Sequence, residues 1–427
     1  MQKSQADVIV VGAGPVGAYA AWKMAEQGLQ VAVLERQRRD DASSDIGAFH
    51  FERPAFDRLD IEPPPRDKLI CTYSGMTIHS PDGNHAVEVT GVETWALDLA
   101  EFIDNLRQKA TEAGATIHYG TQVVDIIRDG DRVVGVKAQG PKGDVEYTAK
   151  VTVDATGMTR AVRRHLPSMN DIAGDGVFSV YMEYWTDAEN EPADGIHSYL
   201  GPNAWTAKYK EYVIVGIGQP LPLEQTKAAH AAWVDRHLPG KHTVSEKVVG
   251  VIPYAYPPLT LVDDGVVVIG DAAATNKPFN GEGIASGMTL AKIAAEELPQ
   301  AIQAGGTRSA LWNINRRYFT DQGAKFAFIR ATCFELLDMT EQEHIETFAI
   351  GLVNGEDLRQ TFLDFEVKKS PTAWITPVAK LLLRPALAWK YGRAVAKAER
   401  IARCFRQYPT EAKFAGWRQK VRKLLAD

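Results

Sequence analysis

Cysteine is scarce in this 427-residue chain, and long apolar runs are absent. Cys71, Cys333 and Cys404 stand far apart without Cys-x-x-Cys spacing, which argues against a disulfide framework and against a zinc or iron–sulfur site. We expect them to be small buried side chains. No stretch of about 18 uncharged apolar residues could span a bilayer. No signal peptide precedes the first strand, so we expect a cytoplasmic protein.

The chain also lacks the side-chain sets of several enzyme classes. Neither a Ser-His-Asp set nor a histidine-rich cluster is legible, and we expect no metal site. Hydrophobic residues make up 45% and charged residues 24% of the sequence, as in an ordinary folded protein. The length exceeds that of one simple domain. The informative signal is the placement of glycine.

The first glycine motif follows an apolar strand that spans residues 8–11. Gly12 permits a tight turn, Gly14 lets the backbone approach a pyrophosphate, and Gly17 allows the next helix to pack closely on the strand. The positive end of that helix can then receive phosphates. A second strand ends at Glu35, where an acid binds ribose hydroxyls and would repel a 2′-phosphate. The motif predicts a dinucleotide site that disfavours NADP.

The second glycine motif distinguishes FAD from NAD. A strand over residues 266–269 runs into Gly270 and Asp271, and the turn 281–284 opens a helix. FAD carries a ribityl chain whose hydroxyls need a carboxylate beyond the first nucleotide-binding unit, and Asp271 has that position. The helix start could stabilise negative charge on a reduced flavin, with Pro278 on the flavin-facing wall. The two motifs together predict FAD.

These motifs resemble those of the geranylgeranyl reductase family, within the superfamily that has the p-hydroxybenzoate hydroxylase-type flavin fold. The resemblance covers about residues 6 to 300. It rests on the two glycine motifs, on Asp154-Ala155-Thr156-Gly157 followed by Arg160 and Arg163, and on Ile252-Pro253. The residues that we expect to contact FAD are Gly12, Ala13, Gly14, Pro15, Val16, Gly17, Glu35, Arg36, Gly47, Val123, Asp154, Gly157, Gly270, Asp271, Pro278, Gly281, Glu282, Gly283 and Ile284.

Three segments depart from the family pattern. Residues 45–50 replace a Cys-Gly stretch that faces the flavin in many members, so no thiol role carries over. Residues 97–99 lack an arginine that often contacts FAD. Of the aromatic-x-Trp-x-Phe-Pro-Lys motif on the substrate strand, only Trp205 and Lys208 remain. The substrate can therefore differ from that of the archaeal members.

The resemblance implies an α/β fold with a FAD-binding Rossmann-like domain of the glutathione-reductase type, an antiparallel-sheet substrate domain and a C-terminal helical region. We expect residues 1–165 and 251–300 to form the FAD-binding domain, residues 166–250 the substrate domain, and residues 301–427 the helical region with a basic tail. The segment 46–94 should be irregular, with flavin-capping loops and some strands of the substrate sheet. Outside these, we expect helices at 99–113, 284–304, 311–337, 342–352 and 358–367, and strands at 115–119, 121–128, 133–138 and 145–153.

The function that the resemblance implies is flavin-dependent reduction of isolated C=C bonds in a polyprenyl chain, with an external electron donor such as NAD(P)H or ferredoxin. Alternating aromatic and apolar residues between 178 and 218 suggest a sheet that is either a hydrophobic substrate wall or plain core. We expect Trp205, Tyr181 and Tyr254 to contact a hydrophobic or lipid substrate. The proton donor stays open among His50, His79, Tyr181 and Tyr254.

Two rival functions remain at this point. A flavin monooxygenase or halogenase would bring reduced flavin to O₂, although the Trp-x-Trp-x-Ile-Pro motif of halogenases is missing. A flavoprotein that carries electrons or acts as a membrane-bound sensor is the non-enzymatic alternative. An enclosed apolar pocket over the flavin would favour an enzyme.

The tail differs in charge from the rest of the chain. Residues 366–427 contain 15 Lys and Arg against 4 Asp and Glu, a net charge of +11; because the whole chain carries −6, the other residues carry −17. Apolar and basic residues alternate there, as in a helix on an anionic membrane. They are Trp374, Ile375, Val378, Lys380, Leu381, Leu382, Leu383, Arg384, Leu387, Trp389, Lys390, Tyr391 and Arg393. We expect either peripheral contact with the inner face of a membrane or docking on the acidic body. Nucleic acid is not expected.

Overall fold

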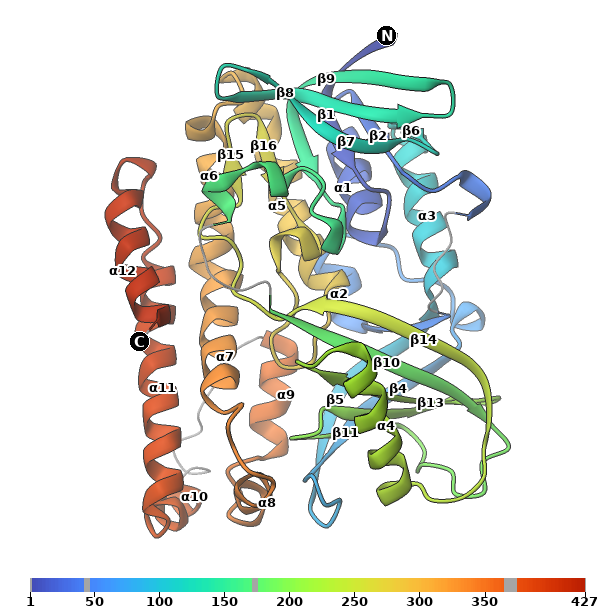
Figure 1. Ribbon diagram of the computed structural model, residues 1–427, viewed down its shortest axis with the longest axis vertical. Coiled ribbons are helices and arrows are strands. Elements are labelled where there is room, and N and C mark those ends of the chain that lie inside the picture. Colours follow the sequence, from blue (N-terminus) through green and yellow to red (C-terminus); the bar gives the residue numbers. More distant parts are fainter. Residues whose placement is uncertain (1, 42–46, 171–175, 365–374, 427) are drawn as a thin grey trace.

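Two eight-stranded sheets and a set of C-terminal helices make up the molecule. The computed structural model describes residues 2–41, 47–170, 176–364 and 375–426. In Figure 1 the first sheet lies in the upper half, the second lies below it, and the C-terminal helices run along the left side. Residues 45 and 46 of the departing segment, and Trp374 of the tail, lie outside the described residues.

The first sheet carries the nucleotide-binding topology. Its main path is β15-β16-β9-β1-β2-β6, and β7 and β8 join it through β9. The pairs β1–β2, β1–β9, β9–β16 and β2–β6 are parallel, and β7–β8–β9 is an antiparallel meander. The strands are β1 (Gln2–Val11), β2 (Val31–Leu34), β6 (Thr116–His118), β7 (Gln122–Asp129), β8 (Arg132–Gly140), β9 (Gly143–Asp154), β15 (Val262–Asp263) and β16 (Val266–Val268).

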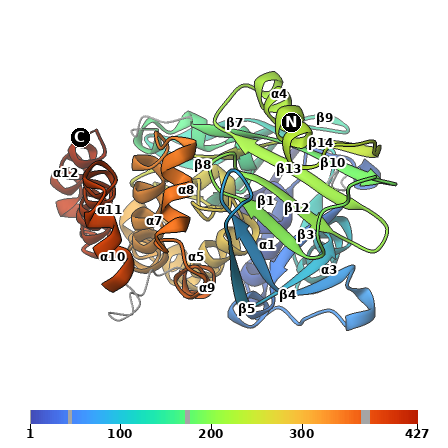
Figure 2. The same ribbon diagram turned by 90° about the horizontal axis from the view of Figure 1, so that it is seen from below.

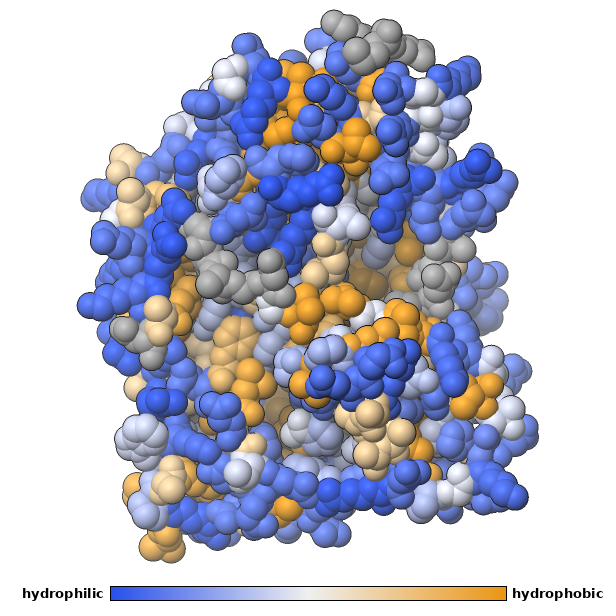
Figure 3. Space-filling view, in the orientation of Figure 1, coloured by the Kyte–Doolittle hydropathy of each residue, from blue (hydrophilic) through white to orange (hydrophobic). Residues whose placement is uncertain are grey.

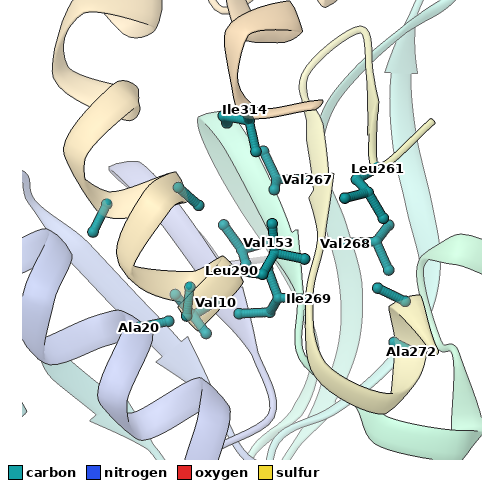
Figure 4. Close-up of a cluster of buried hydrophobic side chains, with 14 of the residues drawn as sticks. Val10, Ala20, Val153, Leu261, Val267, Val268, Ile269, Ala272, Leu290 and Ile314 are labelled. Carbon is teal, nitrogen blue, oxygen red and sulfur yellow. The ribbon is translucent and has the colours of Figure 1, made fainter. Parts of the chain in front are cut away.

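Continuous apolar runs explain why these strands form the centre of the fold. Residues 8–11 and 266–268 are buried, as is expected for parallel strands that are covered on both faces. Helices α1 (Pro15–Glu26) and α5 (Ile284–Gln303) pack against each other beside this sheet. Figure 4 shows the resulting core, where Val10, Val153 and Leu290 meet from two strands and a helix.

The second sheet has the strand order β14-β10-β13-β12-β11-β4-β5-β3. All of its pairs are antiparallel except β11–β4, which is parallel. The strands are β3 (Ala48–Glu52), β4 (Cys71–His79), β5 (Ala86–Asp98), β10 (Val177–Thr186), β11 (Ile196–Tyr199), β12 (Ala204–Lys208), β13 (Val213–Gln219) and β14 (Thr243–Pro253).

The expectation that residues 46–94 would be irregular was wrong. Three strands of the second sheet and the short helix α2 (Arg53–Arg58) occupy most of this segment. The pattern was obscured because β4 and β5 are only partly buried, so that their apolar residues do not form a clean run. The segment does contribute strands to the second sheet, as expected.

Helices outside the sheets follow the expected ranges closely. Asp98 ends β5 and caps α3 (Leu99–Glu112) by accepting a hydrogen bond from the backbone N–H of Glu101. The expected helix 311–337 is α6 (Arg308–Tyr318) and α7 (Ala324–Glu335), joined by a π-helical turn over residues 319–323. The helix α4 (Leu223–His237) was not expected. The remaining helices are α8 (Glu341–Ala349), α9 (Gly355–Asp364), α10 (Ile375–Leu382), α11 (Pro385–Arg406) and α12 (Phe414–Ala426).

The described part of the tail is docked on the body of the protein. Figures 1 and 2 both place α11 beside α7. The apolar side of α11 is buried, and Lys397 forms an ion pair with Glu335 of α7 at 2.6 Å. None of the helices in the described ranges combines the length and apolar character needed to cross a bilayer. Docking on the body therefore explains the apolar residues on one side of α11.

Phe405 tests the contribution of this docking to stability. Its ring is fully buried between Phe319 and Trp417. Phe405→Ala should lower the free energy of unfolding by about 3–5 kcal/mol, because it leaves a cavity in a packed core. Trp389→Ala on the same helix should change it by less than about 0.5 kcal/mol, since that side chain is 64% exposed. Urea denaturation of both variants measures the difference. Equal losses would contradict the observed docking.

Candidate functional site

One cavity of about 650 Å³ brings the two glycine motifs together. Gly12 and Gly14 line it from the first motif, and Gly281 and Gly283 line it from the second. The motifs are more than 250 residues apart in the sequence, so only the fold joins them. A cavity of this size lies within the range of about 300–1,000 Å³ that is typical of ligand sites.

Most of the residues expected to contact FAD line this cavity. They are Gly12, Gly14, Pro15, Val16, Glu35, Arg36, Val123, Gly157, Gly270, Asp271, Gly281, Gly283 and Ile284. The other expected residues are not part of its lining, and they are Ala13, Gly17, Gly47, Asp154, Pro278 and Glu282. The cavity also has polar lining groups that were not among the expected contacts, which are Gln37, Arg107, Thr121, Gln122, Thr156, Thr159 and Arg164.

The glycines of the first motif have two different roles. A Cβ atom on Gly17 would lie 2.1 Å from the carbonyl oxygen of Gly12, so only glycine allows α1 to approach β1 this closely. Gly12 itself has φ 98° and faces the backbone of Ala155. A Cβ on Gly14 would meet no atom within 4 Å. Gly14 therefore lies open toward the cavity, while Gly17 serves packing.

Glu35 holds the glycine-rich turn in shape. Its carboxylate accepts hydrogen bonds from the backbone N–H of Ala13 at 2.7 Å and from that of Gln37 at 2.9 Å. Arg107 of α3 braces the same turn from the other side, because its Nε donates to the carbonyl oxygen of Ala13 at 2.9 Å. Arg107 lies among the apolar residues of the buried side of α3. A cation in that position was a sequence signal for a structural role, and this signal was missed.

Asp154 is committed to the protein itself. Its carboxylate accepts hydrogen bonds from the backbone N–H groups of Thr156, Val162 and Arg163 and from the hydroxyl of Thr156. The side chain is fully buried. Asp154 therefore shapes the turn that carries Gly157 into the cavity wall, and it does not reach the cavity.

Asp271 of the second motif lines the cavity, and its carboxyl group lies close to Gly283. Burial, with a smaller contribution from the charge of Glu282, raises the pKa of Asp271 to about 6. Burial also raises the pKa of Glu282, against the opposing effect of Lys277. The Glu282 carboxylate accepts a hydrogen bond from the backbone N–H of Ala285 at 2.7 Å, so it caps the first turn of α5.

Two buried cations near the second motif were not indicated by the sequence motifs. Lys277 forms an ion pair with Glu52, which belongs to β3 of the other sheet. Arg330 of α7 is 1% exposed and donates to the carbonyl oxygens of Ala255, Ala274 and Asn276. Both side chains join the loop between β16 and α5 to distant elements. Partners at such separations leave no local pattern in a sequence.

The second sheet meets the cavity through Ile252 of β14, which is part of its lining. Residues directly opposite each other in antiparallel strands share a face. Phe178 of β10 is opposite Ile252, and Met182 lies on the same face of β10 because side chains alternate along a strand. Met182 is opposite Gly216 of β13, and Gly216 is opposite Trp205 of β12. Trp205 thus lies on the face that meets the cavity.

Tyr181 lies on the opposite face of this sheet. It packs with Val215 and with Trp233 of α4, and its hydroxyl donates to Glu183 at 2.6 Å. Tyr254, in contrast, stacks on Phe178 with 3.9 Å between ring centroids, next to Ile252. Of the three residues expected to contact the substrate, Trp205 and Tyr254 share the cavity face of the sheet.

The two histidines considered as proton donors have protein partners. His50 forms a hydrogen bond with the hydroxyl of Tyr209 at 2.8 Å, and burial lowers its pKa to about 4. His79 forms a hydrogen bond with His197 at 2.9 Å, and burial together with neighbouring histidines lowers its pKa to about 4. Both are neutral at pH 7. Among the described residues, no group of three or more His, Cys, Asp or Glu could hold a metal ion.

The fold and the cavity define a dinucleotide-binding protein. The second glycine motif adds lining residues beyond those of the first nucleotide-binding motif. Residues 7–49 and 81–297 match the model of the FAD-dependent oxidoreductase family, and the chain belongs to this family. It is a FAD-dependent oxidoreductase. The open backbone at Gly14 and the carboxylates of Glu35 and Asp271, which line one cavity, suit this cofactor.

Curated relatives with similar sequences include digeranylgeranylglycerophospholipid reductases. The chain is 29% identical, over 71% of its length and 77% of the relative, to digeranylgeranylglycerophospholipid reductase 2 of Methanococcoides burtonii. It is 23% identical, over its whole length and 99% of the relative, to digeranylgeranylglycerophospholipid reductase of Sulfolobus acidocaldarius.

Solved structures with the same fold fall into several classes. A geranylgeranyl bacteriochlorophyll reductase-like protein from Thermoplasma acidophilum superposes with a TM-score of 0.77 at 19% identity, over 93% of this chain and 99% of that chain. A flavin-dependent brominase superposes with a TM-score of 0.67 at 17% identity, over 91% and 100% of the two chains. At these identities the likeness concerns the fold alone.

The two roles of glycine can be separated by substitution. Gly14→Ala should fold with nearly unchanged stability but bind FAD at least about tenfold more weakly, because its methyl group would enter the cavity. Gly17→Ala should unfold at lower urea concentration, because its methyl group would meet the Gly12 carbonyl. Urea denaturation of the apoproteins and FAD titration measure these effects. Two variants with the same stability and the same FAD affinity would refute the distinction.

The raised pKa of Asp271 predicts that the affinity for FAD depends on pH. Because the pKa of Asp271 is raised to about 6, its charge is present above that pH and is lost below it. An ionised acceptor binds hydroxyl groups more strongly than a neutral one by about 1–1.5 kcal/mol, so affinity should fall about tenfold from pH 8 to pH 5. Asp271→Asn should bind weakly at both pH values. A wild-type affinity that does not change with pH would contradict this role.

Proposed function

We propose that this oxidoreductase reduces C=C bonds in the polyprenyl chain of a lipid. The observation that carries the proposal is the similarity to two curated relatives that are both named digeranylgeranylglycerophospholipid reductase. The same proposal includes a FAD domain of the glutathione-reductase type and a substrate domain formed by the second sheet. It also includes the domain limits that the sequence suggested.

The second sheet supports the proposal by the shape of its cavity face. Gly216, Gly218 and Gly250 lack side chains there, and a Cβ on Gly216 would lie 2.3 Å from the Trp205 ring. The indole therefore lies flat on β13. In Figure 3 apolar side chains line a hollow between the upper and lower parts of the molecule. A flat apolar wall suits a flexible hydrocarbon chain and excludes water.

When bound, FAD supplies the hydride that alkene reduction requires. The protein must hold the alkene on the wall around Trp205 and provide a proton for the second carbon. Tyr254 is the proton donor that we favour among the candidates, since it lies on the cavity face. Burial raises the pKa of its phenol. Its hydroxyl keeps its proton at neutral pH.

The cellular setting is part of the same proposal. A lipid substrate would place the protein in the cytoplasm, with peripheral contact to a membrane. The electrons would come from an external donor such as NAD(P)H or ferredoxin. The second candidate function is a flavin monooxygenase or halogenase, which is favoured by the likeness of the fold to a brominase.

Anaerobic reduction followed by rapid mixing distinguishes the two functions. The reduced holoprotein should be oxidised quickly by a lipid with geranylgeranyl chains, and mass spectrometry should show two added hydrogens per reduced bond. Trp205→Ala should slow this step at least about tenfold without loss of FAD. Tyr181→Phe, on the opposite face, should leave it unchanged. Slow oxidation by the lipid, with hydroxylation of an added phenol under O₂, would favour the monooxygenase instead.

A further inference from the structure

Exposed apolar side chains gather where α10 turns into α11. Val378 is 38%, Leu382 69%, Leu383 80% and Trp389 64% exposed, and they make up half of the large hydrophobic side chains that stand exposed in the described ranges. We call these four residues the α10–α11 corner. In Figure 1 the corner lies at the lower left end of the molecule, and orange side chains stand there in Figure 3. Such a gathering in twelve residues marks an interaction site.

The corner is held on a packed support. Leu381 and Leu387 point inward, where Leu387 is 3% exposed and packs with Met339, Ile350 and Leu352. Pro385 begins α11 and fixes the turn between the two helices. Adjacent leucines of the same segment are thus divided between a buried side and an exposed side. The exposed ones are presented by the fold and are not left over from poor packing.

The support also orders the cations beside the corner. Arg384 pairs with Glu346 at 3.3 Å, Lys390 with Glu343 at 2.7 Å and Arg393 with Glu335 at 3.0 Å. These ion pairs connect the segment to α7 and α8.

Positive charge also remains on the solvent-exposed side of α10 and α11. The guanidinium of Arg393 lies 5.0 Å from the Trp389 ring centre and stays half exposed. Lys380 of α10 is exposed, and Arg400 and Arg403 continue the exposed side of α11. The apolar corner is therefore bordered by positive charge.

We propose that the α10–α11 corner inserts into the surface of an anionic lipid bilayer. Leucines at a fixed turn supply apolar area, tryptophan prefers the interface between acyl chains and headgroups, and the bordering cations attract anionic headgroups. A second copy of this chain is the less suitable occupant, because a symmetric contact would bring the cations of both copies together. This inference concerns docking and goes beyond the proposed reaction, so it can fail while that reaction holds.

Flotation of the full-length FAD-bound protein with lipid vesicles tests the inference. Vesicles that contain phosphatidylglycerol should bind the protein, pure phosphatidylcholine vesicles should bind it poorly, and binding should weaken as salt is raised. The triple variant Leu382→Ser, Leu383→Ser, Trp389→Ala should bind at least about tenfold more weakly, because it removes most of the exposed apolar area. Its FAD content and melting temperature should match those of the wild type.

A matched control places the same kind of change elsewhere. Val249 and Val251 on β14 are 55% and 49% exposed, and Val249→Ser with Val251→Ser should leave vesicle binding unchanged. Lys380→Gln with Arg400→Gln should reduce binding to anionic vesicles only. Equal vesicle binding by the triple variant and the wild type would overturn the inference. So would a dimer of the wild type that the triple variant abolishes, since the corner would then be an interface between two copies.

Discussion

The close approach of α1 to β1 and β9 is the constraint on which the site depends. Gly17 touches the Gly12 carbonyl, and Gly12 touches the backbone of Ala155, so three elements meet without side chains between them. This contact aims the N-terminus of α1 at the cavity. It also places the ends of β1 and β9 side by side, as the pairing of Val11 with Asp154 shows. Glu35 and Arg107 then secure the turn from two sides.

The second motif depends on contacts of a different kind. The loop between β16 and α5 contains Ala274 at φ 53° and is held by buried charges, with Arg330 on one side and Lys277 on the other. A buried cation requires several acceptors to offset its lost hydration, and the carbonyl oxygens of Ala274 and Asn276 in the loop provide two of them for Arg330. The helical region thereby supports this part of the site, although none of the described lining residues belongs to residues 301–427.

The nucleotide-binding part of the site could be predicted because its signals are local. Gly12, Gly14 and Gly17 lie within one turn and one helix, and Glu35 follows at the end of the next strand. The face on which Tyr181 lies could not be predicted. Strand β10 lies inside the sheet and carries aromatic residues on both faces, and only the unexpected helix α4 shows which face is covered. The buried side of α4 contains Thr226 and His230, which hid its helical period.

The tail shows why charge alone could not choose between docking on the body and contact with a membrane. One side of α11 buries Ala394, Ala398 and Phe405 against the body, while the other carries exposed arginines. The sequence shows the residues of both sides of the helix in one stretch. Docking on the body and contact with a membrane therefore each explained part of the pattern. Docking fixes which leucines of α10 are covered, and it therefore determines which of them are available to a partner. A docked helix and an exposed apolar corner are thus two consequences of the same packing.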